Sequence, residues 1–208
     1  MKCGLSKNRR IMAFHEFIKG DGWQVIEDDT VFSNPYLEVH RVSVTSPMRA
    51  EPFLWTVCHR KAAVVVAART SENRFLLVRQ ERVPIMATIW EFPAGQIDEA
   101  TEHDPGVIEG TGLRELREEA GFELASGGKV VSLGHFFPSA GFTDEHSHLL
   151  LASPVIRSPL GSAHDNSEAI AECREFSAEE VRSMIASGEI RDANTLAAFA
   201  RLVAMDLL

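Results

Sequence analysis

Nine residues near the middle of the chain, 114–122, constrain its fold more than any other segment. They read Arg-Glu-Leu-Arg-Glu-Glu-Ala-Gly-Phe. On a helix, Glu115, Glu118 and Glu119 would lie three and four residues apart, so their carboxylates would share one face. The glycine near the end of the segment suits the position that follows a helix. We therefore predict a helix over residues 109–120, ended by this glycine.

Such a helix is unfavourable by itself. Like charges at this spacing repel by roughly a few tenths of a kcal/mol per pair. Carboxylates close to a helix C-terminus oppose its dipole by about 0.3–1 kcal/mol each. Two interpretations stay open from these residues alone: an acidic face solvated by water, or a ligand set for a hard cation such as Mg²⁺, which prefers oxygen ligands. The cation resolves the conflict better, and local rules are most often broken at functional sites.

Composition narrows the functional classes. The 208 residues carry a formal net charge of −9, which argues against general nucleic-acid binding but not against a phosphorylated small substrate. No apolar run approaches the roughly 20 residues that span a bilayer. Cys3, Cys58 and Cys173 lie far apart without metal-ligand spacing, so we expect free thiols in a reducing cytoplasm.

The hydrophobic pattern predicts two domains. Residues 1–60 hold an N-terminal tail and short alternating segments, which indicate a small accessory antiparallel sheet. Residues 61–208 form the main domain, where unbroken apolar runs indicate strands buried on both faces. Residues 81–90 are predicted to be a loop, and Ser177 opens a helix as a capping box. The segments expected to form strands in this domain are 62–68, 75–78, 90–95, 130–137, 147–152 and 170–176, and a last helix starts near residue 194.

Gly95 and the segment 114–122 together resemble the Nudix box, Gly-x5-Glu-x7-Arg-Glu-U-x-Glu-Glu-x-Gly-U, where U is apolar. The second half of the box is complete. The first half is five residues longer than the family pattern, and its intermediate Glu is out of register: Thr101 or Gly106 stands there, depending on the end from which one counts. We expect an enlarged loop over residues 99–108, and the candidates for the displaced carboxylate are Glu99, Glu102 and Glu109.

The flanking segments resemble ADP-ribose pyrophosphatases within this family. They are Gln80-Glu-Arg82, residues 90–98, the proline-containing loop 137–145 and the tail 188–196. The resemblance implies an α/β (α+β) fold, a Nudix-type α/β/α sandwich with a mixed sheet, plus the small N-terminal sheet. It also implies metal-dependent hydrolysis of the diphosphate linkage of a nucleoside diphosphate sugar, with ADP-ribose as the first candidate.

The resemblance assigns roles to individual residues. In the family, the glutamates matching Glu115, Glu118 and Glu119 hold Mg²⁺ or Mn²⁺, together with the backbone carbonyl matching Ala94. The carboxylate matching Glu145 orients or deprotonates the attacking water. Glu115 and Glu119 thus count as both metal-binding and catalytic.

Substrate contacts are expected at Arg82, Trp55 and Gly95. The planar guanidinium of Arg82 matches two phosphate oxygens at once. Trp55, or Trp23, would stack on the adenine, although plain packing explains these side chains equally well. His146 and His148 adjoin Glu145 in sequence. Because Mg²⁺ prefers oxygen ligands, we expect them on the surface or as supporting residues rather than as its ligands.

The family commonly exchanges its N-terminal sheet across a homodimer, so residues 22–60 imply a homodimer. Three alternatives remain open. The first is a related activity on GDP-mannose, UDP-sugars, dinucleoside polyphosphates or FAD. The second is a catalytically inactive module that binds ADP-ribose, and the third is a structural protein with an acidic surface helix.

Overall fold

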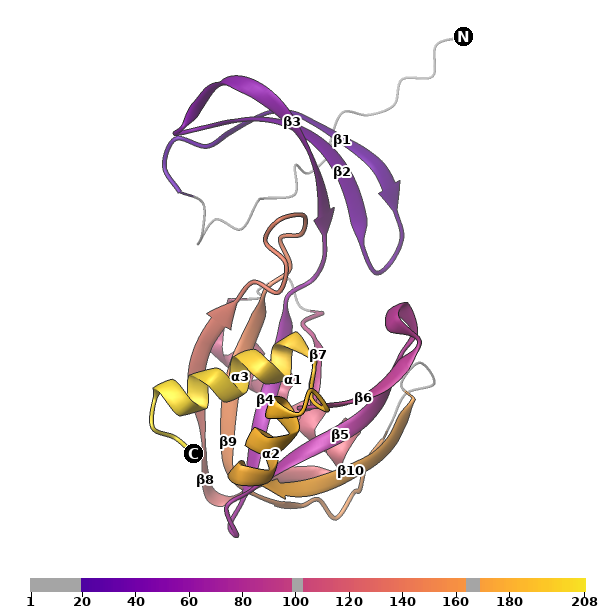
Figure 1. The fold of residues 1–208 in the computed structure, drawn as a ribbon, viewed down its shortest axis with the longest axis vertical. Helices are drawn as coiled ribbons and strands as arrows, with labels where there is room; N and C mark the ends of the chain where they lie inside the picture. Colours follow the sequence, from indigo (N-terminus) through magenta and orange to yellow (C-terminus); the bar gives the residue numbers. More distant parts are fainter. Residues whose placement is uncertain (1–19, 99–102, 164–168) are drawn as a thin grey trace. The chain divides into compact units, whose positions relative to one another are not determined.

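The computed structural model describes residues 20–98, 103–163 and 169–208 (Figure 1). The chain divides into two compact units, Met1–Arg60 with Ser139–Asp144, and Lys61–Pro138 with Glu145–Leu208. The segment Ser139–Asp144 therefore groups with the first unit, although it lies in sequence between two strands of the second. The predicted N-terminal tail and the predicted carboxylate candidates Glu99 and Glu102 lie outside the described residues.

The first unit is a three-stranded antiparallel sheet in the order β1-β2-β3. Its strands are β1 (Gln24–Ser33), β2 (Glu38–Ser46) and β3 (Arg49–His59). The segment Ser139–Asp144 is bound to β3 through backbone and side-chain groups. The N–H of Cys58 donates to the carbonyl of Phe142 over 2.7 Å, and the indole N–H of Trp55 donates to the carbonyl of Gly141 over 3.1 Å.

The second unit is built on a sheet of seven strands. The sheet is mixed, as the family resemblance implies. The path β10-β5-β4-β9-β8 forms its main order, while β6 pairs with β5 and β7 pairs with β4. β4 and β9 are parallel, and the other pairs are antiparallel. The strands are β4 (Ala63–Thr70), β5 (Arg74–Arg82), β6 (Ala87–Glu91), β7 (Ala94–Gln96), β8 (Phe122–Phe136), β9 (Ser147–Arg157) and β10 (Ile170–Ser177).

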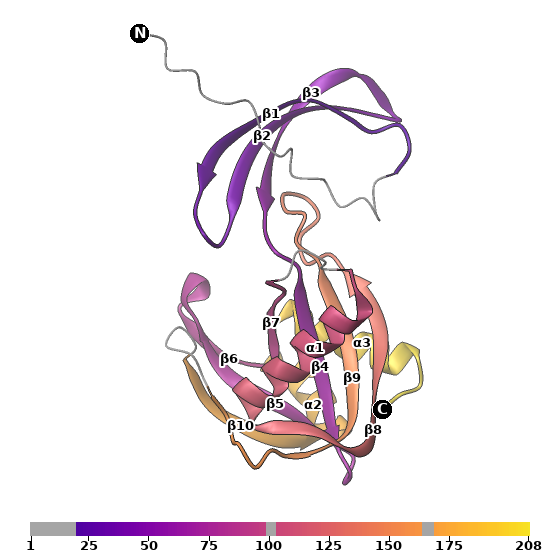
Figure 2. The same ribbon diagram turned by 180° about the vertical axis from the view of Figure 1, so that it is seen from behind.

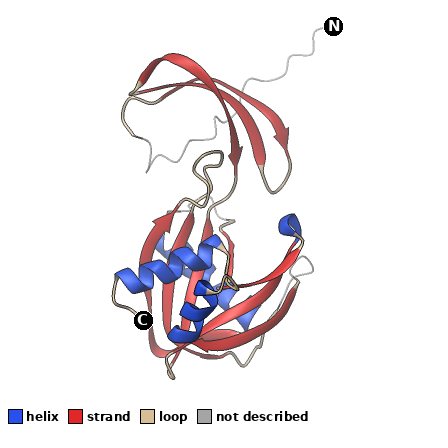
Figure 3. Ribbon diagram, in the orientation of Figure 1, coloured by secondary structure: helices blue, strands red, loops and turns tan. Residues whose placement is uncertain are grey.

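Helices cover both faces of this sheet (Figures 1, 2 and 3). α1 (Pro105–Glu115) lies on one face, and α2 (Ala178–Ala186) and α3 (Ala193–Ala204) lie on the other. Successive side chains of a strand point to opposite faces, so β4 contributes side chains to two separate cores. Val64 and Val66 pack in the core beneath α1, and Val65 and Ala67 pack in the core with α2 and α3. The α/β/α sandwich is confirmed.

Two local predictions were wrong. Most of residues 81–90 is not a loop, because β5 continues to Arg82 and pairs with β6 after the short helix η1 (Val83–Ile85). The helix begins at Pro105 rather than near 109, so the expected loop over residues 99–108 is partly helical. The start signals were present in the sequence. Asp104 caps the helix by accepting from the N–H groups of Gly106 and Val107, and proline is favoured in the first turn.

The predicted capping box is confirmed, since Ser177 and Glu180 satisfy each other's backbone N–H groups at the start of α2. Among the described residues, no helix has both the length and the apolar character needed to cross a bilayer.

Candidate active site

The three box glutamates lie where α1 passes into a single turn of π-helix, η2 (Leu116–Ala120). Glu115 and Glu119 are 4% and 2% exposed, while Glu118 is half-buried. The segment ends at Gly121, whose φ of 72° favours glycine. A π-helical turn is uncommon and is found frequently at functional sites. The carboxylates are therefore held against the protein rather than spread into solvent.

Two arginines of the same segment hold two of these carboxylates, those of Glu115 and Glu118. Arg114 lies 2.5 Å from Glu115 and 2.8 Å from Glu118, and Arg117 lies 2.6 Å from Glu118. The segment carries three carboxylates but only two guanidinium groups, so it keeps an excess negative charge. An ionised carboxylate is costly to bury unless it is paired or coordinates a metal. The donor set, buried and rich in oxygen, fits a hard divalent cation.

The other wall of the site is the short strand β7. The backbone N–H of Ala94 donates to Oε2 of Glu119 over 2.9 Å. In a strand, the N–H and C=O of one residue face the same edge. Because the neighbouring Pro93 carbonyl accepts from Val66 on β4, the carbonyl of Ala94 faces away from β4, on the side of Glu119. The predicted carbonyl ligand and a predicted carboxylate ligand thus face each other.

Glycine is required at position 95 because the backbone there lies very close to the side chain of Glu115. A Cβ at this position would lie 2.0 Å from Oε1 of Glu115 and 2.1 Å from its Cδ. No side chain can occupy that space unless Glu115 moves. The structure gives this glycine a steric role beside the carboxylates, and its predicted contact with substrate stays a prediction.

A hydrogen-bonded chain that the sequence did not reveal fixes the segment before β7. The N–H of Phe92 donates to the hydroxyl of Thr195 over 2.9 Å, and that hydroxyl donates to Asp192 over 2.8 Å. Asp192 also caps α3 by accepting from the N–H of Thr195. Thr195 is fully buried. An Asp three residues before Thr is a recognisable cap, but its link to Phe92 spans 103 residues and needs the fold.

Arg82, at the end of β5, is bound to Glu91 of the neighbouring strand β6, although in the register of the hairpin Arg82 lies opposite Ala87. Its Nε donates to both carboxylate oxygens, over 2.8 and 3.1 Å, and its Nη2 makes a further short contact. These bonds to Glu91 raise the pKa of Arg82, and the charges of Asp192 and Glu119 act in the same direction. Arg82 therefore lies within the field of the acidic segment. Its side chain is 39% exposed, so part of the guanidinium is accessible to a phosphate.

Glu145 is half-buried and lies two residues before the start of β9. The N–H of Ala63 donates to the carbonyl of the next residue, His146, over 3.0 Å. Ala63 also pairs with Gln96 of β7 on its other side. Since neighbouring strands lie about 4.8 Å apart, β7 and the start of β9 flank the same end of β4 at about 10 Å. The topology thus brings the loop of Glu145 to the edge that carries Ala94.

Trp55 and Trp23 belong to the first unit, where both line a cavity of about 840 Å³. The cavity is walled mainly by apolar side chains of the three-stranded sheet, and the segment around Gly141 closes part of it. Trp55 also packs edge-on against Phe53, with 6.5 Å between ring centroids. Stacking of either tryptophan on a base stays a prediction.

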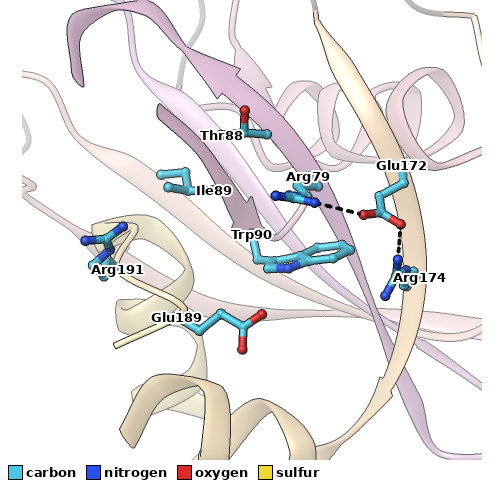
Figure 4. Close-up of a pocket in the computed structure, with 8 residues that line it drawn as sticks. All are labelled: Arg79, Thr88, Ile89, Trp90, Glu172, Arg174, Glu189 and Arg191. Carbon is cyan, nitrogen blue, oxygen red and sulfur yellow. Dashed lines mark hydrogen bonds and ion pairs between the residues drawn. The ribbon is translucent and has the colours of Figure 1, made fainter. Parts of the chain in front are cut away.

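A separate hollow of about 300 Å³ lies in the second unit between β5, β6, β10 and the segment after α2 (Figure 4). Glu172 bridges two of its arginines, at 3.4 Å from Arg79 and 2.6 Å from Arg174. Arg174 also lies over the ring of Trp90, 5.5 Å from its centroid. None of the residues predicted for the site lines this hollow. Because these charged side chains are paired with one another, we interpret the hollow as part of a surface ion-pair network.

Comparison with known proteins supports the family. The NUDIX domain model matches residues 59–199. The ADP-ribose pyrophosphatase of Bacillus subtilis (strain 168) is 31% identical over 172 residues, which cover 83% of this chain and 88% of that protein. The methanol dehydrogenase activator of Bacillus methanolicus is 30% identical over 175 residues, covering 84% and 89% of the two chains.

A further relative and a solved structure agree. The ADP-ribose pyrophosphatase of Mycobacterium tuberculosis (strain ATCC 25618 / H37Rv) is 29% identical over 153 residues, covering 74% of this chain and 67% of that protein. The crystal structure of an ADP compounds hydrolase superposes with a TM-score of 0.69 at 15% identity, covering 89% and 97% of the two chains. At that identity the likeness concerns the fold alone. Taken with the buried carboxylates at the end of α1, the comparisons show that this chain belongs to the Nudix family and is a Nudix hydrolase, which acts on phosphorus-containing anhydrides.

Proposed function

We propose that this enzyme hydrolyses the diphosphate linkage of a nucleoside diphosphate sugar, with ADP-ribose as its best substrate and AMP and ribose 5-phosphate as products. We further propose that the reaction requires Mg²⁺ or Mn²⁺. The observation that carries the proposal is the burial of Glu115 and Glu119 against β7, where excess negative charge is retained.

The residues that would hold the cation are Glu115, Glu118 and Glu119, with the carbonyl of Ala94. When bound, the cation shields the diphosphate charge and lowers the pKa of the attacking water. The protein contributes the position of each ligand. Arg114 holds Glu115 and Glu118 together, and the N–H of Ala94 orients Glu119. Preorganised ligands of this kind need little rearrangement during the reaction.

Glu145 is assigned to the attacking water. A carboxylate within hydrogen-bond reach orients the water or accepts its proton as oxygen attacks phosphorus. The bridging P–O bond then breaks, and its oxygen leaves with the other phosphate. The bond between Ala63 and the carbonyl after Glu145 fixes the backbone on which this side chain depends.

The nucleotide-sugar class is supported by two kinds of observation. Two relatives carry the name ADP-ribose pyrophosphatase, and the alignment with one of them covers 83% of this chain. Arg82, near the acidic segment and partly exposed, suits a phosphate oxygen. The pairing with Glu91 holds its guanidinium in one orientation, which favours phosphate recognition by geometry as well as by charge.

We also propose a homodimer formed through the N-terminal sheet. A lone three-stranded sheet is marginal in water without a surface to pack against. Large apolar side chains of this sheet are exposed, which is typical of an interaction surface. They include Ile26, Val31, Phe32, Leu54 and Trp55. Analytical ultracentrifugation of the full chain is expected to give twice the monomer mass, and a monomer at micromolar concentration would contradict this assignment.

A substrate panel tests the activity. The purified chain with Mg²⁺ would be assayed on ADP-ribose, GDP-mannose, a UDP-sugar, a dinucleoside polyphosphate and FAD, and ranked by kcat/KM. We expect ADP-ribose to lead by about tenfold or more, because base contacts discriminate by at least this factor. A different leader would replace the substrate. Tight binding of ADP-ribose without any turnover would establish the inactive binding module instead.

A chelator tests the cation independently. Excess EDTA should abolish AMP release, and Mg²⁺ or Mn²⁺ should restore it. Full activity in excess chelator would overturn metal dependence, whichever substrate leads the panel.

A further inference from the structure

Four histidines gather in the second unit around the start of β9. His146 and His148 alternate along the chain, so their side chains share one face. His135 on β8 pairs directly with His148. His103 comes from a distant part of the sequence, immediately before Asp104, which caps α1. The fold thus brings together imidazoles from three separate segments.

We propose that His103, His146 and His148 bind a divalent transition metal of the Zn²⁺ type, at a site distinct from the acidic one. Each of the three offers a ring nitrogen, and these nitrogens all lie within 4.8 Å of one another. The ring centroids of His146 and His148 are 5.1 Å apart, and those of His103 and His146 are 5.4 Å apart.

The spacing is close to what coordination requires. Tetrahedral zinc with Zn–N bonds of about 2.0–2.1 Å places its ligand nitrogens about 3.4 Å apart. Side-chain rotations that move the ring nitrogens by about 1 Å bring them to that separation. His103 is exposed and can turn toward His146 and His148, while His146 is fully buried and fixes the position of the site.

The chemistry of the donors selects the metal. Imidazole nitrogen suits Zn²⁺, Co²⁺, Ni²⁺ and Cu²⁺, whereas Mg²⁺ prefers oxygen, and no carboxylate belongs to this group of three. The neutral imidazole is the form that ligates.

His135 has a supporting place in this arrangement. Its ring centroid lies 6.2 Å from that of His146 and 6.1 Å from that of His148. It does not belong to the group of mutually close nitrogens. We assign it to positioning His148, its cross-strand neighbour, and we assign the fourth coordination position to water on the exposed side of His103.

The site is separate from the acidic segment. Glu115 lies ten residues after Pro105 on α1, which corresponds to about 15 Å along the helix axis. A metal on the three histidines would instead join the start of α1 to the start of β9. His146 directly follows Glu145, so the ion would also restrain the backbone of that residue. Its role is to position and stabilise rather than to react with substrate.

The test is a Zn²⁺ titration of the full chain after removal of metals. Excess Mg²⁺ is kept present so that oxygen ligands are occupied, and binding is followed by calorimetry. We expect one Zn²⁺ per chain and a rise in melting temperature. His103→Ala should weaken Zn²⁺ binding by more than about 100-fold, since even the loss of an outer-shell partner costs 10–100-fold. Because His103 is exposed, this variant should melt like the wild type without metal.

Two further variants decide between outcomes. His40→Gln removes a histidine of the first unit and should leave Zn²⁺ affinity unchanged. Glu119→Gln should also leave it unchanged, because the acidic segment contributes no ligand. Co²⁺ should give visible absorption bands of a tetrahedral site in the wild type and lose them in His103→Ala. Wild-type Zn²⁺ affinity in His103→Ala, or loss of binding in Glu119→Gln, would overturn the proposal.

Discussion

The backbone N–H of Ala94 donates a hydrogen bond of 2.9 Å to the carboxylate of Glu119. This bond joins β7 to the last turn of the box helix across 25 residues of sequence. The helix alone would hold its carboxylates only relative to one another. The bond to β7 also fixes them relative to the backbone carbonyl proposed as a ligand, so the strand and helix act as one rigid support.

Replacing Glu119 by Gln should remove the negative charge of this side chain and leave the fold intact. The amide oxygen of Gln can still accept from the N–H of Ala94, so the fold should persist. The loss of negative charge should weaken cation binding and lower kcat by about two orders of magnitude or more. Steady-state kinetics with ADP-ribose and Mg²⁺ measures the loss of kcat, and thermal unfolding checks that the fold persists.

The matched control for this variant is Glu179→Gln. Glu179 is exposed on α2, on the opposite face of the sheet, and should tolerate the same change without loss of rate. Near-normal turnover in Glu119→Gln, or an equal loss in Glu179→Gln, would show that Glu119 is not a functional ligand.

Gly95→Ala should damage the site by steric displacement. The added Cβ would lie 2.0 Å from Oε1 of Glu115, so that carboxylate must leave its position. We expect a loss of about 1–3 kcal/mol in the free energy of unfolding, as for other overpacked sites, and at least a tenfold lower kcat. Chemical denaturation and kinetics measure these two effects.

Gly110→Ala is the internal comparison. Gly110 lies on the same helix, α1, and a Cβ there would meet nothing within 4 Å. Alanine in an open helix position should stabilise by about 0.5–1 kcal/mol relative to glycine. If Gly95→Ala were as harmless as Gly110→Ala, the close approach to Glu115 would be unimportant.

The sequence predicted much of the fold because its signals are local. The alternating and unbroken apolar runs identify strands, and Ser177 with Glu180 identifies the start of α2. The repulsion among the box glutamates indicated that something must hold them, and the structure supplies Arg114, Arg117 and the N–H of Ala94.

What the sequence could not predict depends on contacts between distant residues. Trp90 pairs with Arg79 only because β5 continues past Val78, where the predicted strand ended, and no local pattern showed that continuation. The link from Thr195 to Phe92 and the approach of His103 to His146 arise only when the elements pack. The site was therefore predictable where a helix spacing defines it, and unpredictable where the sheet assembles it.

Thr195→Val should loosen the segment before β7. Valine keeps the shape of threonine but removes the acceptor for the buried N–H of Phe92. An unsatisfied buried donor costs about 1–3 kcal/mol, which lowers the melting temperature by roughly 2–4 °C per kcal/mol in a chain of this size. Thr195→Ser keeps the hydroxyl, so the hydrogen bond to Phe92 should persist and the loss of stability should be smaller. Equal losses in the two variants would mean that packing, rather than the hydrogen bond, explains the effect.

His40 should make the stability of the N-terminal sheet depend on pH. Its ring is buried and lies 2.6 Å from Asp28 and 3.2 Å from Glu38. Burial lowers the pKa of His40, but the hydrogen bonds and charges of the two carboxylates outweigh it, so the pKa is raised. The protonated ring is the form that these partners stabilise.

The sign of the effect follows from the direction of that shift. A histidine whose pKa is higher in the folded state stabilises fully below its unfolded pKa of about 6.5, and this contribution is lost as pH rises through the folded pKa. Hydrogen exchange of the β2 amides from about pH 5.5 to about pH 8.5, corrected for intrinsic rates, measures the stability of the sheet. Protection should fall with rising pH in the wild type and change much less in His40→Gln, which cannot be protonated. If protection in the wild type rose with pH, or if both proteins changed equally, a group other than His40 would control the sheet.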